Sequence, residues 1–196
     1  AGTLSATAQG TLLAAGSMLA GITQTLSAGD GMTVDGTVAA LQGDLTLDTL
    51  RGNLVLGAAS NQQAGGRLAA TAGGALQALG SAAAGQGVTL RAGTDATLGG
   101  IAATQAGNVT VNANGNLTTT SNARIQTAEA IDLQAGGALQ NAGILSAAGA
   151  ATLLAGTTLN NTGSVLAGGD INATALGALG NAGRFIAGVG EDGTLS

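Results

Sequence analysis

The sequence has no cysteine, histidine, proline, tryptophan or tyrosine, and Phe185 is its single aromatic residue. Without histidine or cysteine, the chain lacks the usual zinc ligands and the residues of nucleophilic triads. With a single aromatic side chain it lacks the platforms on which glycosidases usually hold sugars, and no phosphate-binding loop is present. We therefore expect no enzymatic activity, no cofactor and no metal site.

Charged residues are also scarce. The chain has five arginines, no lysine and ten acidic residues, which gives a net charge of −5. Nucleic acids and anionic membrane surfaces are bound by clustered cations, and here the arginines are scattered singly. The most apolar stretch, residues 12–22, is too short to span a bilayer. We expect no nucleic-acid partner and no membrane insertion by this segment.

What the chain does contain is small residues. Glycine occurs 36 times, and 45% of the residues are hydrophobic. A glycine-rich composition is common in disordered proteins, but the regular placement of the apolar residues argues against disorder. Collagen is excluded, because there is no proline and no three-residue glycine period. Small aliphatic side chains at regular positions favour a narrow, repetitive core.

The most regular stretch runs from Ile131 to Ala187, where one unit occurs three times, starting at Ile131, Ala151 and Ile171. Its apolar residues recur at a spacing of two, which is typical of strands, and Gly and Asn separate the strands. A fixed period built from short strands predicts a solenoid. The equivalent positions are Ile131/Ala151/Ile171, Leu133/Leu153/Ala173, Leu139/Leu159/Leu179, Asn141/Asn161/Asn181, Gly143/Gly163/Gly183, Leu145/Val165/Phe185 and Ala147/Ala167/Ala187.

The same unit extends toward the N-terminus. Equivalent strands begin at Leu68, Val88 and Val109, before the strand that begins at Ile131. The steps between these starting positions vary by one or two, and extra residues of this kind belong in turns that face water. After Ala187 the pattern stops, and residues 191–193 are predicted to form a polar turn.

Residues 1–64 follow the unit less closely. A first unit runs from about Gln9 and the next opens at Met32. Two leucine pairs, 45/47 and 54/56, can each open the following coil, and we favour the later pair, which begins at Leu54. We expect residues 1–196 to form a single repeat segment, an internal fragment of a longer chain, that is least regular at about 33–64. The predicted inward residues of the first units are Leu12, Ala14, Leu19, Leu26 and Ala28.

Each unit is predicted to form one coil of an all-β, right-handed parallel β-helix with about nine coils. Coils stacked at about 4.8 Å make a rod of roughly 40–45 Å. Proline is absent because every backbone N–H is needed in a ladder. We expect the corner glycines to adopt positive φ, with asparagine tolerating the same region. Phe185 is wider than the rest of its column and is expected where the regular stack ends.

Three groups of polar residues are candidates for a site. The column Asn141, Asn161 and Asn181 suggests a ligand, but stacked asparagines more often form a structural ladder of side-chain amides. A calcium site needs converging oxygens, and we expect solvated side chains for the acidic group. The N-x-[ST] matches are expected by chance in a chain rich in Asn and Thr. The acidic group is Asp30, Asp35, Asp44 and Asp48, and the N-x-[ST] matches are Asn108, Asn116, Asn160 and Asn172.

The unit from Ile131 to Ala147 resembles the repeats of the filamentous-haemagglutinin family of large exoproteins. The shared form is x-hydrophobic-x-hydrophobic-x-A-G-x-x-L-x-N-x-G-x-hydrophobic, and it covers residues 68–187 well and the rest loosely. The resemblance implies a β-helical shaft that an outer-membrane transporter exports by two-partner secretion. It implies display or release at the surface of a Gram-negative bacterium, and virulence through attachment to a host receptor or glycan.

Two other functions stay open at this stage. The first is a shaft of a contact-dependent inhibition or toxin-delivery exoprotein, which belongs to the same repeat family. The second is a polysaccharide-processing β-helix, in which Asp44 or Asp48 would have to act on an acidic glycan. No individual binding residue carries over from the family to this sequence.

Overall fold

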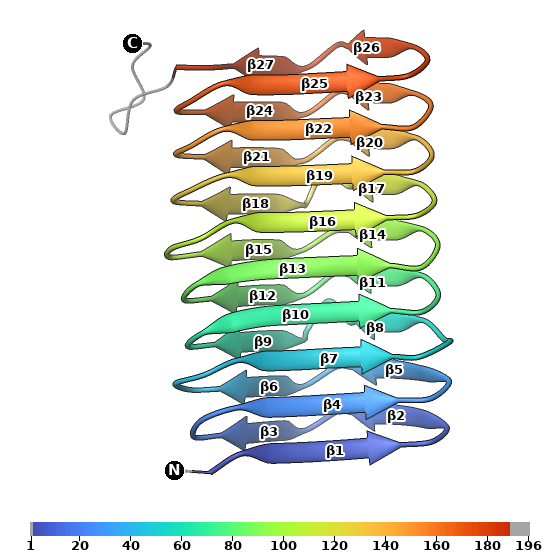
Figure 1. The fold of residues 1–196 in the computed structure, drawn as a ribbon, viewed down its shortest axis with the longest axis vertical. Helices are drawn as coiled ribbons and strands as arrows, with labels where there is room; N and C mark the ends of the chain where they lie inside the picture. The colour runs from blue at the N-terminus through green and yellow to red at the C-terminus, as the bar shows by residue number, and fades with distance from the viewer. Residues whose placement is uncertain (1, 189–196) are drawn as a thin grey trace.

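The computed structural model describes residues 2–188 and shows a stack of parallel coils. The predicted turn at 191–193 lies outside the described residues. Within residues 2–188 there are 27 strands and no helix, so this part has no helix that could cross a membrane. The strands form three parallel nine-stranded sheets, and each coil contributes one strand to each sheet. The coils rise with a right-handed sense from the N-terminus to the C-terminus (Figure 1). The predicted fold class is therefore confirmed.

We call the sheets A, B and C in the order in which each coil enters them. Sheet A contains β1 (Leu4–Ala8), β4 (Gln24–Ala28), β7 (Leu45–Thr49), β10 (Arg67–Ala72), β13 (Gly87–Ala92), β16 (Val109–Ala113), β19 (Ile131–Ala135), β22 (Ala151–Ala155) and β25 (Ile171–Ala175). Sheet B contains β2 (Thr11–Ala14), β5 (Gly31–Val34), β8 (Leu54–Leu56), β11 (Leu76–Ala78), β14 (Ala96–Leu98), β17 (Leu117–Thr119), β20 (Leu139–Asn141), β23 (Leu159–Asn161) and β26 (Leu179–Asn181). Sheet C contains β3 (Ser17–Ala20), β6 (Thr37–Ala40), β9 (Asn61–Ala64), β12 (Ser81–Ala84), β15 (Ile101–Thr104), β18 (Arg124–Thr127), β21 (Ile144–Ala147), β24 (Ser164–Ala167) and β27 (Arg184–Ile186).

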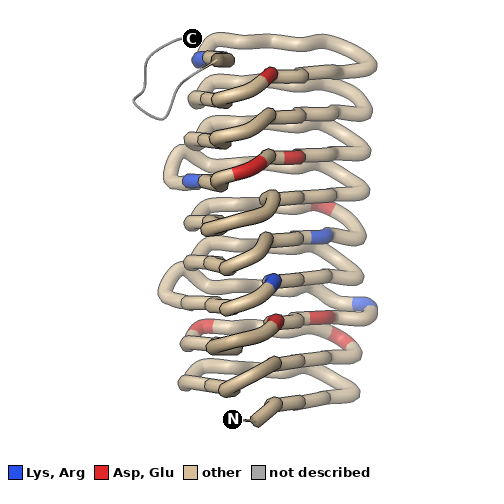
Figure 2. Tube along the Cα trace, turned by 60° about the vertical axis from the view of Figure 1, so that its left-hand side comes forward, with Lys and Arg blue, Asp and Glu red and all other residues tan. Residues whose placement is uncertain are grey.

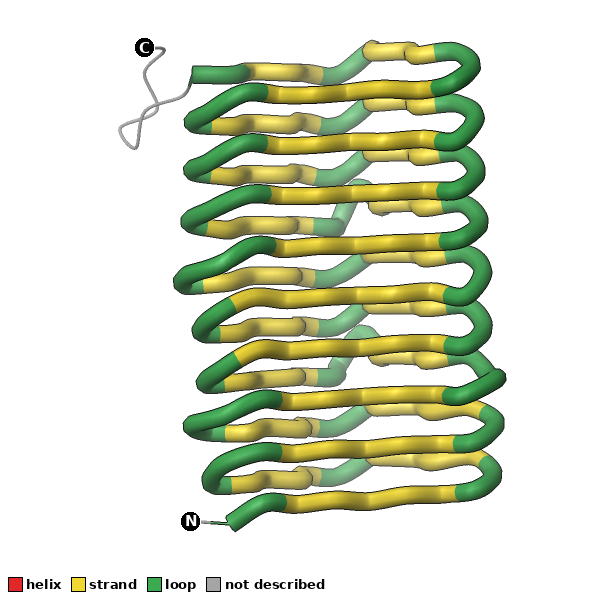
Figure 3. Tube along the Cα trace, in the orientation of Figure 1, coloured by secondary structure: helices red, strands yellow, loops and turns green. Residues whose placement is uncertain are grey.

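The ladder register confirms the predicted spacings. Met32 pairs with Leu54 at the favoured spacing of 22 residues, and Val109 pairs with Ile131. Each coil enters at sheet A, however, so the coil that contains Leu54 opens with the other leucine pair, at Leu45. The largest insertions lie at one corner, between sheets B and C. There the chain makes outward turns at residues 57–60 and 120–123, in coils that are three apart (Figure 3). The sheets continue past both turns without a break, so the insertions change the corner and not the ladder.

The core consists of inward columns of small aliphatic side chains. In β19, Ile131, Leu133 and Ala135 are buried, while Asp132 and Gln134 between them are more exposed. Residues at the same position in successive coils stack on one another, so the inward columns are mostly aliphatic, although large and small side chains alternate in places, as where Ala151 follows Ile131. Phe185 continues the column of Val165 in the last described coil, where it is only half-buried.

Two predictions for the first coil are wrong. The coil starts at Leu4, upstream of the predicted start at Gln9, because β1 already pairs with β4. Leu19 faces outward and is 58% exposed, whereas Met18 points into the core. Met18 and Leu19 are adjacent and both apolar, so hydrophobicity alone does not say which one faces inward. Ala14, Leu26 and Ala28 are buried as predicted, and Leu12 is half-buried.

The predicted role of the corner glycines is also wrong. Among the described residues, only Gly87, Gly107 and Gly188 have positive φ, and no other residue type does. The corner glycines are required by close approach to the coil below. A Cβ on Gly163 would lie 2.1 Å from the carbonyl oxygen of Gly143. Where this corner has no inserted residues, glycine is needed because successive backbones stack with no room for a side chain; the two coils with longer turns carry Ser60 and Ala123 at this position.

Candidate functional site

The asparagine column lies inside the coil stack, at the end of the sheet B strands. The Nδ2 of Asn141 donates to the Oδ1 of Asn161 at 2.7 Å, and the Nδ2 of Asn161 donates to the Oδ1 of Asn181 at 2.7 Å. Asn141 and Asn161 are 1% and 0% exposed, so water does not reach either amide. The three side chains form a continuous hydrogen-bonded ladder along the axis of the rod.

Neighbouring groups make further hydrogen bonds to these amides. Thr119, one coil below, donates its hydroxyl to the Oδ1 of Asn141, and the backbone N–H of Gly143 donates to the same oxygen. The Nδ2 of Asn161 also lies within hydrogen-bond distance of the Arg184 carbonyl, at 3.3 Å. The amides of Asn141 and Asn161 are paired and buried, so they hold the coils together and offer no open position to a ligand, whereas Asn181 ends the ladder on an exposed strand.

A second set of hydrogen bonds between coils was missed from the sequence. Five Asp or Asn side chains each stand immediately before a strand and accept a backbone N–H from the next coil. The distances from Oδ1 to the backbone nitrogen lie between 2.7 and 3.1 Å. The signal was visible as an Asp or Asn directly before the first strand residue. The pairs are Asp44 with Arg67, Asn53 with Ala75, Asp95 with Asn116, Asn108 with Ala130, and Asn116 with Ala138.

These bonds also place two of the N-x-[ST] asparagines. Asn108 and Asn116 lie at corners and accept backbone N–H groups through Oδ1. Asn160 and Asn172 are exposed on strands β23 and β25. The four asparagines are spread along the stack and form no common surface.

The acidic residues near the N-terminus do not converge. Asp30 accepts a 2.9 Å bond from the Nη2 of Arg51, and Asp44 accepts from the backbone of Arg67. Asp35 lies at another corner, and Asp48 is on the outer face of sheet A. Figure 2 shows the charged positions scattered around the rod. Within residues 2–188, no three acidic side chains are grouped closely enough to hold a metal ion.

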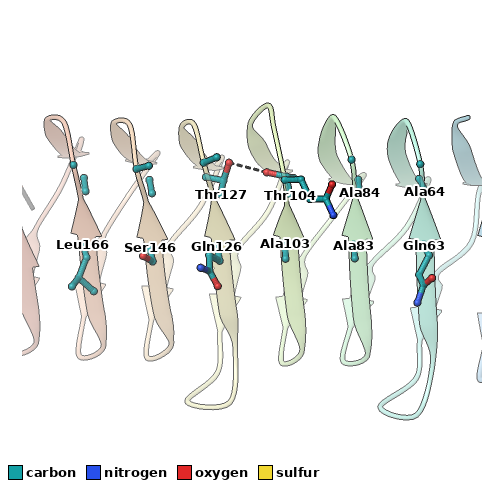
Figure 4. A pocket seen from close by; sticks show the side chains of 18 residues that line it. Gln63, Ala64, Ala83, Ala84, Ala103, Thr104, Gln126, Thr127, Ser146 and Leu166 are labelled. Atoms are coloured by element: carbon teal, nitrogen blue, oxygen red, sulfur yellow. Dashed lines mark hydrogen bonds between the residues drawn. The ribbon is translucent and has the colours of Figure 1, made fainter. Parts of the chain in front are cut away.

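A groove of about 970 Å³ runs along the outer face of sheet C. It crosses six coils, from β9 to β24, and therefore extends for about 24 Å at 4.8 Å per coil. Small side chains make its floor shallow, and longer ones stand at intervals along it (Figure 4). One outward row in the groove consists of Gln63, Ala83, Ala103, Gln126, Ser146 and Leu166.

The groove is neutral and weakly polar. None of its lining residues carries a charge. The hydroxyl of Thr104 donates to the carbonyl oxygen of Gly107, and it lies 2.8 Å from the hydroxyl of Thr127. The Thr127 hydroxyl donates to the same carbonyl at 2.6 Å, so both threonines are engaged. Amides such as those of Gln63 and Gln126 remain directed to solvent, and they can exchange hydrogen bonds with an extended neutral ligand.

Two glutamines are buried at positions where other coils carry aliphatic residues. Gln24 stacks between Leu4 and Leu45, and Gln62 stacks between Val38 and Ala82. Both amide atoms of each glutamine are buried without a hydrogen-bond partner. They lie in the core rather than on the groove surface. Their unpaired amide groups are expected to weaken the stack.

Comparison with known proteins gives no relative for this chain. No protein-family model, no curated protein and no solved structure matches it.

Proposed function

We propose that this chain is a shaft segment of a secreted or surface-displayed bacterial adhesin that mediates attachment to host cells. The observation that carries the proposal is the unbroken ladder: all three sheets pass through nine coils with one strand from each coil. Such a stack is long and stiff, and it can be extended by adding further repeats, because each coil contacts mainly its neighbours.

The repeat units around Ile131 support the bacterial and secreted part of the proposal, through their resemblance to filamentous-haemagglutinin repeats. On this proposal an outer-membrane transporter exports the chain by two-partner secretion and it contributes to virulence. The absence of cysteine suits such a route, because no disulfide can lock the chain in an oxidising periplasm before export.

We further propose that the chain is not an enzyme and that attachment uses its outer surface. The buried asparagines are paired with one another, and the acidic residues are dispersed. The neutral groove on sheet C is the surface best shaped for an extended host glycan or receptor segment, since it is long and shallow and carries exposed amides such as those of Gln63 and Gln126.

An attachment assay tests this function. Beads coated with the folded chain are expected to adhere to cultured epithelial cells more than albumin-coated beads do. Equal adhesion would contradict the adhesin proposal. The variant Ala103→Trp fills the groove and is expected to lower adhesion at least threefold. The matched control Thr89→Trp places the same side chain outward on sheet A and should leave adhesion unchanged. Equal adhesion of the two variants would show that the groove is not the contact surface.

A further inference from the structure

The stack contains a longer repeat of three coils. Two segments share four landmarks in the same order: a Gly-Asn-Leu tripeptide, an outward corner turn, an outward glutamine and the hexapeptide Ala-Gly-Gly-Ala-Leu-Gln. The segments lie 63 residues apart, from Gly52 to Gly115 for the tripeptide and from Ala72 to Ala135 for the hexapeptide. This shift carries β8 to β17 and β9 to β18, which are three strands apart in their sheets.

The hydrogen bonds of the two segments repeat as well. Asn53 and Asn116 each accept a backbone N–H from the next coil at 2.9 Å. Each outward turn is closed by a backbone hydrogen bond between residues three apart. The donor and acceptor pairs are Ser60 with Gly57 at 2.9 Å and Ala123 with Thr120 at 3.0 Å. The same local structure therefore occurs twice along one side of the rod.

Each repeat places one exposed glutamine in the groove on sheet C. Gln63 and Gln126 follow the two turns at the same distance, and both side chains are exposed on the outer face. Ala83 and Ala103 lie between them in the same outward row, as Figure 4 shows. Since three coils separate the glutamines, their amides stand about 14 Å apart at 4.8 Å per coil. The groove therefore has two polar contact points separated by a low apolar floor.

The charges near the groove disfavour an anionic ligand. None of the lining residues is charged, and the chain as a whole has ten acidic residues against five arginines. Arg124 is exposed on the same strand as Gln126, and the exposed Glu129 directly follows the lining residue Ala128. A sialylated or sulfated chain would find no cluster of cations with which to pair. An uncharged ligand matches this surface better.

The direction of the groove disfavours a peptide strand. The groove crosses the strands of sheet C, whose backbone groups already pair between successive coils. Extended peptides usually bind by adding to an open sheet edge through main-chain hydrogen bonds. A ligand in the groove meets side chains instead, which are the amides, the alanine floor and Ile101, 47% exposed on the strand that carries Ala103. Hydroxyl and acetamido groups of a glycan can pair with the amides, and its C–H groups can lie on the apolar floor.

We infer that the groove binds a neutral, linear glycan that spans two equivalent subsites, one at Gln63 and one at Gln126. This ligand class rests on the proposed adhesin function and is narrower than the glycan or receptor segment named there. A chain that reaches both glutamines makes its second contact within one complex, so its affinity exceeds that of either contact alone. A shorter chain can occupy only one subsite at a time.

An array of immobilised linear glycans tests the ligand class. Each neutral chain is paired with its sialylated or sulfated form and is present in lengths shorter and longer than about 14 Å, the span of three coils. We expect the folded chain to bind long neutral glycans more strongly than their short or charged forms. Binding to charged forms only, or to no glycan, would overturn the inference.

Calorimetric titration with the best neutral glycan from the array measures the role of the two glutamines. Gln63→Leu and Gln126→Leu should each weaken binding of the long form at least tenfold, because either change leaves a single subsite. Neither should weaken binding of the short form more than about threefold, because the other subsite remains. The same loss for short and long forms would overturn the two-subsite arrangement.

The same three-coil repeat supplies matched controls. Gln77 and Gln140 are also exposed and 63 residues apart, but they lie on the outer face of sheet B. Gln77→Leu and Gln140→Leu should bind the long glycan as the wild type does. Equal losses in the groove variants and in these controls would overturn the assignment of the subsites to the groove.

Adhesion to glycosidase-treated cells separates this inference from the adhesin proposal. We expect beads coated with the chain to adhere to treated epithelial cells no more than albumin-coated beads do. Adhesion that persists on treated cells and is still lowered by Ala103→Trp would indicate a protein receptor, which overturns the glycan ligand and leaves the adhesin proposal intact. Binding on the array without adhesion to untreated cells would support the glycan site and contradict the adhesin proposal.

Discussion

Asn141 and Asn161 lie one above the other in the core, and the Nδ2 of Asn141 donates a 2.7 Å hydrogen bond to the Oδ1 of Asn161. An isolated amide in this position would be costly, because it is removed from water. Each amide is instead satisfied by the amide of the next coil. The same side chain at the same place in successive coils therefore turns a buried polar group into a bond between coils.

Removing one member of this ladder should weaken the stack. Asn161→Ala leaves the Asn141 and Asn181 amides without their partner, and we expect a loss of about 2–3 kcal/mol in the free energy of unfolding. Urea unfolding followed by circular dichroism measures it. The control Asn160→Ala changes the exposed neighbour on the same strand and should stay within about 0.5 kcal/mol of wild type. Equal effects of the two variants would contradict the ladder's stabilising role.

Replacing a buried glutamine is expected to stabilise the stack. Gln62 is 0% exposed, and neither of its amide atoms has a hydrogen-bond partner. Gln62→Met keeps the shape and removes the unpaired polar atoms, so we expect a gain of about 1–2 kcal/mol. Gln63→Met, on the outer face of the same strand, serves as the control and should have little effect. A lower urea midpoint for Gln62→Met would show that its amide is satisfied in solution.

The close-approach explanation for the corner glycines can be tested by comparing alanine substitutions at two positions of one column. Gly163→Ala puts a Cβ 2.1 Å from the carbonyl oxygen of Gly143, and we expect a loss of at least about 2 kcal/mol. Gly16→Ala, at the equivalent corner of the first coil, meets no atom within 4 Å and should be nearly neutral for the single chain. Thermal unfolding at low protein concentration compares the two. A similar loss at both positions would point to backbone conformation as the cause, and would contradict the close-approach explanation.

A modular shaft should tolerate the loss of one whole coil. Deleting residues 151–170 joins Ala150 to Ile171 in register, because Ile131 pairs with Ala151 and Ala151 pairs with Ile171. We expect a folded chain that is shorter by about 4.8 Å, measured by small-angle X-ray scattering. Deleting only residues 151–160 breaks the register and is expected to unfold the C-terminal coils. Folding of both deletions to the same extent would contradict the modular stack.

Much of the fold could be predicted from the sequence because two patterns, the alternation of apolar residues and the repeat period, indicate the same structure. A spacing of two marks strands, and the regular period around Ile131 fixes which strands stack. The step from Met32 to Leu54 also followed from alternating leucines. The side chosen by Met18 or Leu19 could not be predicted, because both are apolar and adjacent.

The polar contacts and the groove were harder to predict from the sequence. Asn141, Asn161 and Asn181 could be placed at one position of the coil, but the bonds of Asp44 or Asn53 to the next coil depend on corner geometry. Gln62 breaks the apolar pattern of its column, so no hydrophobic signal marks it as buried. The groove consists of outward residues from six coils. It exists only after stacking brings together positions that are a full coil apart in the sequence.

Distances between spin labels test the coil stack most directly. The outward column that joins Ser5, Thr25, Thr110, Thr152 and Asn172 runs the length of sheet A, and the chain has no native cysteine to interfere. Pairs of labelled cysteines at 25/110, 25/152 and 5/172 span four, six and eight coils. In samples diluted with unlabelled chain, we expect narrow distributions centred at about 19, 29 and 38 Å, since each coil adds about 4.8 Å. Broad distributions, or distances that do not increase in proportion to the number of coils, would contradict the rigid shaft.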